Sequence, residues 1–166
     1  MKGIGKVAGV GSTSLQPYDF RSGMGSNFSL ALNYQDPCIW EGVTKLLNEY
    51  KCIRHLFAGD FHPLTPYRVS DDVWLAWQFN RSDLGEGLVQ AFRRSGSGIS
   101  THQFRLHGLN PKALYEWKDV DSGRTAKMTG DALMERGLEV QVKDQPSTPR
   151  QKFVTSWMLC LNQIVA

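Results

Sequence analysis

Acidic side chains are the first candidates for chemistry, because two carboxyl groups placed across a bond can act as general acid and base. Adjacent carboxylates on an extended edge point to opposite faces and cannot clamp one substrate. Carboxylates that flank a turn more often hydrogen-bond the backbone of that turn. The close acidic pairs are Asp71–Asp72 on a predicted strand edge, Asp83 with Glu86 in a predicted turn, and Asp119 with Asp121 around another turn. None of these pairs predicts a catalytic site.

Cysteine and histidine supply the usual ligands for metals. The three cysteines and four histidines show no C-x-x-C or H-x-x-x-H spacing. They are Cys38, Cys52 and Cys160, and His55, His62, His102 and His107. An odd number of widely spaced cysteines gives no disulfide framework, and buried, inert thiols are the expected role. We therefore expect neither a metal site nor a cofactor.

The overall composition excludes several partners. Lys and Arg number 19 against 16 Asp and Glu, and this net charge of +3 is too small and dispersed to favour nucleic acid. No run reaches the roughly 18 apolar residues of a membrane span. Met1-Lys2 is followed by Gly-rich sequence rather than by the apolar stretch of a signal peptide. We expect a globular protein of the cytoplasm with no membrane partner.

The first third of the chain predicts one strand–helix unit. Residues 1–17 hold glycines that miss the G-x-G-x-x-G spacing of a nucleotide site and predict a flexible leader. Residues 28–34 alternate between apolar and small or polar side chains, which is typical of a strand. Asp36-Pro37 is a helix start, and large apolar side chains then recur every three or four residues from Trp40 to Phe57, with Gly59 placed to cap the helix.

The remainder predicts a different architecture. Residues 60–67 contain two prolines and predict an extended connector, with a domain border near Tyr67. Short alternating segments then follow every 8–12 residues or so, separated by turns. They cover 73–79, 88–93, 102–106, 114–118, 124–128 and 138–142, with one short helix at 131–136. This spacing is typical of an antiparallel β-sandwich.

Several runs resemble a known family in order and spacing. They are Phe20–Met24, Gly59–Tyr67, Trp77–Gly87, Leu106–Pro111 and Thr129–Leu138. Together they resemble the C-terminal part of glycoside hydrolase family 36, the α-galactosidase family, over Tyr18 to Pro146. In that family a (β/α)8 barrel is followed by an antiparallel β-sandwich.

The resemblance implies a mainly β chain: an antiparallel sandwich at 68–145, preceded at 18–60 by a single strand–helix unit resembling the end of the barrel. The tail, 146–166, does not resemble the family, although Met158-Leu159 and Ile164-Val165 can supply a strand of open register. The family's catalytic residues are two barrel aspartates upstream of this region, a nucleophile and an acid/base of a retaining mechanism. No position of this chain matches them, so the resemblance supplies no catalytic residue.

Three residues are candidates for contact with a substrate. Tyr115 and Trp117 share one strand face, and an exposed aromatic pair can stack on a sugar ring, although core packing is the commoner role. Trp74 and Trp77 lie on opposite faces of their strand, so at least one is expected in the core. Arg21, near a predicted strand start, can border a substrate cleft or pair with a local carboxylate.

Three functions follow. In the first, the chain is the non-catalytic C-terminal portion of an α-galactosidase-like hydrolase, inactive alone, and its partner is a separate barrel domain or a second copy bound through an exposed Trp40–Phe57 helix stripe. In the second, the sandwich is a stand-alone module that binds galactosides or a protein. In the third, the chain is a glycosidase with its own carboxylate pair. The sequence favours them in that order.

Overall fold

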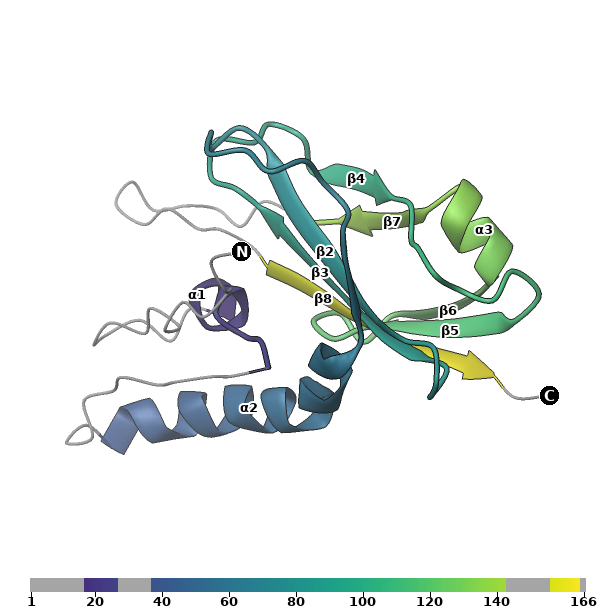
Figure 1. Cartoon of the computed structure of the whole chain (residues 1–166). Helices are drawn as coiled ribbons and strands as arrows, with labels where there is room; N and C mark the ends of the chain where they lie inside the picture. Colours follow the sequence, from purple (N-terminus) through teal and green to yellow (C-terminus); the bar gives the residue numbers. More distant parts are fainter. Residues whose placement is uncertain (1–16, 27–36, 143–155, 165–166) are drawn as a thin grey trace. The chain divides into compact units, whose positions relative to one another are not determined.

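The computed structural model describes residues 17–26, 37–142 and 156–164 of the chain (Figure 1). The chain divides into two compact units, Met1–Ala58 and Gly59–Ala166. The predicted strand at 28–34 and almost all of the predicted leader lie outside the described residues. Within the described residues, no helix is long and apolar enough to cross a membrane.

The first unit is helical in its described part. Helix α1 (Pro17–Ser22) is followed by α2 (Pro37–Ile53), which begins at the predicted proline, and by the 3-10 helix η1 (Arg54–Ala58). The proline suits this position because the first N–H of a helix has no intrahelical partner.

The predicted stripe on α2 is mostly buried rather than exposed. Val43, Leu46 and Ile53 of α2, and Phe57 of η1, are all less than a tenth exposed, whereas Trp40 is 42% exposed. The expectation of an exposed apolar stripe along this helix is therefore wrong except at its first turn. The four buried side chains keep the stabilisation of about 1.5–3 kcal/mol each that burial of a large apolar group provides.

Cys52 departs from its prediction as well. The thiol of Cys52 was expected to be buried, but it is exposed. Cys52 lies on the helix beside the buried stripe and not within it. The side chains of Cys38 and Cys160 lie outside what the structure describes.

The second unit is an antiparallel sandwich, as predicted. Its larger sheet has the strand order β1-β2-β3-β8-β5-β6, and its smaller sheet pairs β4 with β7 (Figure 1). The strands are β1 (Asp60–Pro63), β2 (Trp74–Arg81), β3 (Glu86–Arg93), β4 (Thr101–Phe104), β5 (Leu114–Asp119), β6 (Thr125–Thr129), β7 (Leu138–Gln141) and β8 (Ser156–Ile164). The short helix α3 (Gly130–Glu135) connects β6 to β7.

One apolar core joins the two sheets. It contains side chains from β2, β3, β5 and the smaller sheet, together with Leu133 of α3. Trp74 lies in this core at 4% exposure, while Trp77 packs its ring against Phe92, with ring centres 4.9 Å apart, on the other face of the sheet. The prediction that the two tryptophans face opposite sides is confirmed.

The larger sheet is apolar on both faces at β2 and β3. Leu75, Trp77 and Phe79 alternate with the core positions of β2, and they pair in register with Phe92, Gln90 and Leu88 of β3. Leu88, Gln90 and Phe92 are at most 1% exposed. Sheets that are apolar on both faces are typically covered on both sides by further layers of protein.

The connector and the tail both contribute strands to the larger sheet. The first half of the predicted connector is the edge strand β1, which pairs with β2 from Asp60↔Asn80 to Pro63↔Trp77. The structural border therefore falls at Ala58/Gly59 rather than near Tyr67. Proline is tolerated in β1 because an edge strand has one side without ladder hydrogen bonds. The tail contributes β8, whose open register is resolved by pairing with both β3 and β5.

Candidate functional site

Two buried carboxamides of β2 hold the loop at 106–111 in place. The Gln78 side chain is fully buried; its Nε2 donates to the His107 carbonyl at 2.9 Å, and its Oε1 accepts from the His107 N–H at 2.8 Å. Asn80, 5% exposed, donates from Nδ2 to the Gly108 carbonyl at 2.8 Å. Gln78 thus pairs with the loop backbone as a neighbouring strand would, which satisfies polar groups that would be costly to bury alone.

Glycines make this packing possible. A Cβ on Gly59 would meet the backbone carbonyl of Asn80, and one on Gly130 would meet that of Asn110. Gly108 has a φ of 68°, a conformation that favours glycine, and a Cβ there would lie 3.0 Å from Asn80 Nδ2. Gly59 was predicted as a helix cap, but it is not among the positive-φ glycines of the described residues. Close backbone approach is therefore the reason that the structure gives for glycine at this position.

Four of the five resembling runs meet at this place, which we name the motif junction. The junction is the set of contacts that join Gly59, Gln78 and Asn80, the loop at 106–111, and Gly130. Gly130 also donates its N–H to the Ala113 carbonyl at 2.9 Å. The spacing of these runs along the sequence therefore reflects contacts that hold the sandwich together.

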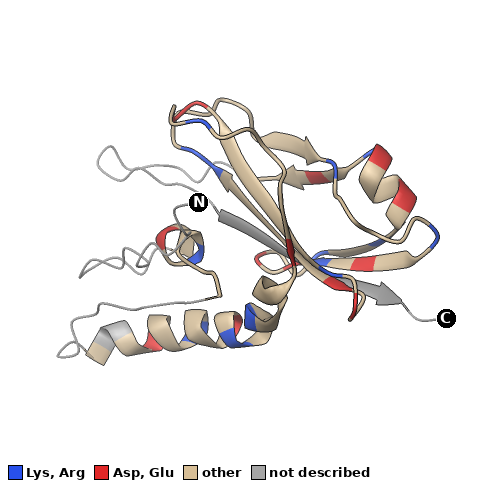
Figure 2. Ribbon diagram, viewed as in Figure 1, with Lys and Arg blue, Asp and Glu red and all other residues tan. Residues whose placement is uncertain are grey.

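The carboxylates do not form a catalytic arrangement at the junction. Among the described residues, the buried polar side chains are Arg21, Gln78, Asn80, Gln90 and Ser97, none of which is acidic. The predicted strand edge at Asp71–Asp72 is instead a turn, because β2 begins only at Trp74, and Asp71 forms an ion pair with Arg94 at 2.8 Å. Acidic and basic side chains are interspersed over the described elements (Figure 2).

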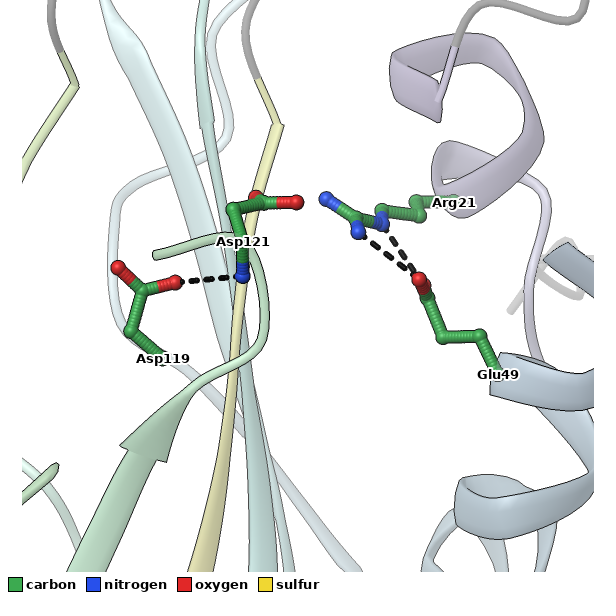
Figure 3. A network of polar contacts seen from close by, with 4 residues as sticks. All are labelled: Arg21, Glu49, Asp119 and Asp121. Carbon is green, nitrogen blue, oxygen red and sulfur yellow. Dashed lines mark hydrogen bonds and ion pairs between the residues drawn. The ribbon is translucent and has the colours of Figure 1, made fainter. Parts of the chain in front are cut away.

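The turn carboxylates hydrogen-bond locally, as predicted. Asp119 accepts from the Asp121 N–H at 2.9 Å through one oxygen (Figure 3). Its other oxygen accepts from the Ser122 hydroxyl. Asp83 accepts two hydrogen bonds from the Arg81 guanidinium at 2.7 and 2.8 Å. These contacts favour turn stabilisation over acid–base work.

Two carboxyl groups have shifted acidity. The hydrogen-bonded Arg81 side chain lowers the pKa of Asp83 below its ordinary value. A side-chain hydrogen bond from Ser70 lowers the pKa of Asp72 in the same direction. A general acid needs a raised pKa near neutral pH, so neither group is suited to that role.

Arg21 pairs with a carboxylate of its own unit. Its Nε and Nη2 donate to the two carboxylate oxygens of Glu49 on α2, at 2.7 and 2.8 Å (Figure 3). Both side chains are largely buried, at 5% and 11% exposure. Arg21 lies on helix α1, the strand predicted to follow it lies outside the described residues, and a substrate role for it stays a prediction.

Tyr115 and Trp117 share one face of β5, as predicted, and that face is the core. They are 4% and 6% exposed, and the Tyr115 hydroxyl accepts from the Asn110 N–H at 3.0 Å. Arg124 lies over the Trp117 ring, with its Cζ 5.6 Å from the ring centre. This burial favours core packing, and sugar stacking by this pair stays an untested prediction.

No group of three or more His, Cys, Asp or Glu side chains is arranged to hold a metal ion in the described part of the chain. The buried carboxamides and the contact between His62 and His107 were missed by the sequence analysis. The only signal for the carboxamides is that Gln78 and Asn80 occupy core-facing positions of an alternating strand, two and four residues after Ala76.

The fold and the motif junction define an antiparallel β-sandwich domain with no catalytic carboxylate pair evident in its described part. The family model for the glycosyl hydrolase family 36 C-terminal domain matches residues 74–159, more than half of the chain. The chain therefore belongs to glycoside hydrolase family 36, through its C-terminal domain. The comparison with curated protein sequences gives no significant match.

Two of the solved structures of similar fold described below are named as family 36 α-galactosidases. The chain is similar to a Geobacillus stearothermophilus AgaA variant, a family 36 α-galactosidase in complex with stachyose (TM-score 0.68, 22% identity, covering 94% of this chain and 20% of that one). It is also similar to another AgaA variant in complex with 1-deoxygalactonojirimycin (TM-score 0.66, 22% identity, covering 88% and 19%). A third similar structure is the galactosidase domain of the α-galactosidase–sucrose kinase AgaSK (TM-score 0.62, 21% identity, covering 82% and 18%). The chain thus spans about a fifth of the length of these structures.

Proposed function

We propose that this chain is the non-catalytic C-terminal portion of an α-galactosidase-like glycoside hydrolase, and that it supports a catalytic barrel. In this proposal residues 18–60 are the terminal strand–helix unit of that barrel and 68–145 are the main part of the accessory sandwich, whose larger sheet β1 and β8 complete. The barrel lies upstream in the same polypeptide or in a separate chain. Family membership and the lack of a catalytic arrangement at the motif junction together support this assignment.

The distribution of carboxylates is the observation that carries the proposal. A retaining hydrolase needs two carboxyl groups about 5–5.5 Å apart, one on each side of the scissile bond. Asp83 pairs with Arg81, Asp71 pairs with Arg94, and Asp119 binds its own turn. These contacts favour a structural role for the domain over a glycosidase with its own acid pair.

The larger sheet, which is apolar on both faces at β2 and β3, supports the proposal of a protein partner. One face of β2 and β3 covers the core of the sandwich, and the other face carries Leu75, Trp77 and Phe79. A sheet that is apolar on both faces is suited to packing between two layers of protein. The β3 side chains of this face are already buried within the chain. In the proposal a barrel would contact the partly exposed Leu75, Trp77 and Phe79 of β2.

An assay with an aryl α-galactoside tests the proposal. The chain alone should give no release of the aryl group above buffer. Added to a family 36 barrel produced without its C-terminal domain, it should raise the yield of active, soluble barrel. Turnover by the chain alone would overturn the non-catalytic assignment, and an unchanged barrel would overturn the supporting role.

A further inference from the structure

We propose that His62 and His107 form a two-histidine binding site for a divalent transition-metal ion, which clips the edge strand β1 to the loop at 106–111. Spacing along the sequence predicted no such site. The two side chains are 45 positions apart, and the fold brings their ring centres to 5.5 Å.

Gln78 holds the backbone of His107 and lies opposite His62 in the sheet. His62 is its register partner on β1, so the two side chains project from the same face of the sheet. Both hydrogen bonds of the Gln78 carboxamide go to the backbone of His107. One buried side chain therefore fixes the backbone of one histidine and lies beside the other, so little ordering of the chain is left for ion binding to impose.

The distance between the rings fits one bridging ion. A metal about 2.0–2.1 Å from one nitrogen of each imidazole, at a tetrahedral angle, places the ring centres about 5–5.5 Å apart. The planes are tilted by 35° rather than stacked. His107 is exposed and His62 is partly exposed, so each ring can turn about its Cβ–Cγ bond to present a nitrogen to the space between them.

Gly108 brings the loop backbone close to the pair. A Cβ at this position would lie 3.4 Å from His62 Nε2, an ordinary van der Waals contact, so this nitrogen lies beside the loop. Two imidazoles suit Zn²⁺, Ni²⁺ and Cu²⁺ better than Mg²⁺ or Ca²⁺, which prefer oxygen ligands. Water would complete the coordination of the ion, as it does in metal sites with few protein ligands.

Titration of the full chain with NiCl₂ by calorimetry tests the site. One saturable site is expected, and His62→Gln and His107→Gln should each weaken it by at least the roughly 10–100-fold that loss of an outer-shell partner costs. His55→Gln is the matched control, because His55 lies in the other unit, and it should leave the affinity unchanged. Circular dichroism checks that each variant is folded.

A second measurement needs no variant. Paramagnetic Ni²⁺ added to the unmodified chain should broaden the imidazole proton signals of His62 and His107 before those of His55 and His102. Unchanged affinity in folded His62→Gln and His107→Gln variants would overturn the proposal. Broadening centred on another histidine would do the same.

Discussion

The buried carboxamide of Gln78 joins parts of the sandwich that are 29 positions apart in the sequence. It is fully buried, and both of its polar atoms are used by the backbone of His107. Such a group stabilises a fold only while its partners stay in place, because each buried polar group left without a partner costs about 1–3 kcal/mol. The motif junction should therefore be sensitive to changes that leave the apolar core untouched.

Replacement of Gln78 by alanine should lower the free energy of unfolding by about 2–5 kcal/mol, because it removes both hydrogen bonds to the His107 backbone and opens a cavity where the buried side chain was. Urea denaturation of the purified chain measures the loss. Gln103→Ala, at an exposed position of β4, is the matched control and should change stability by less than about 0.5 kcal/mol. Equal losses in the two variants would contradict the role given to Gln78.

The Arg81–Asp83 contact predicts a small dependence of stability on pH. The pKa of Asp83 is lower in the folded chain than its ordinary value of 3.8, so the ionised carboxylate favours folding. This contribution is fully present above about pH 4–5 and is lost as the pH falls below 3.8 through the folded pKa. Asp83→Asn should therefore be less stable than the unmodified chain at pH 7, with the difference vanishing in strong acid. A difference that grows on acidification would show that the sign is wrong.

At the scale of the elements, glycines set how closely segments approach. Gly130 begins α3, and a Cβ there would meet the carbonyl of Asn110 in the neighbouring loop. Gly130→Ala should destabilise the chain by about 1–3 kcal/mol, as overpacking does in other cores. Gly98→Ala is the control, because nothing lies within 4 Å of its Cβ position. Thermal unfolding compares the two variants, and a Gly130→Ala chain as stable as the Gly98→Ala chain would contradict the close approach.

Local sequence patterns predicted the helices and strands better than they predicted which segments contact one another. The alternation at 73–79 and 88–93 and the start of α2 at Pro37 are local patterns, and the structure contains all three. The predicted border near Tyr67 differs from the division at Ala58/Gly59, because the proline of edge strand β1, Pro63, resembles a proline of a connector. The carboxamides and the histidine pair depend on contacts between residues far apart in the sequence, and a local pattern carries no information about such contacts.

At the scale of the whole molecule, the position of β1 decides where the sandwich begins. A chain that starts at Gly59 keeps β1, whereas one that starts at Arg68 exposes the long strand β2 as a new edge. We expect the shorter piece to be less stable and more prone to aggregation than the longer one, since unprotected edges pair with other chains. Size-exclusion chromatography of the two pieces tests this. Identical behaviour would show that β1 is dispensable.

Strand β8 lies between β3 and β5, although it is the last strand in the sequence. Strands β1, β2 and β3 lie on one side of it, and β5 and β6 lie on the other. These two groups share no hydrogen bonds between strands until residues 156–164 are present. During synthesis, β1-β2-β3 and β5-β6 therefore remain two separate parts of the sheet until β8 has been synthesised. Because domains form as the chain emerges at about 5–20 residues per second, this wait leaves two open edges exposed for a time. Chaperone dependence of the nascent chain is the expected physiological consequence.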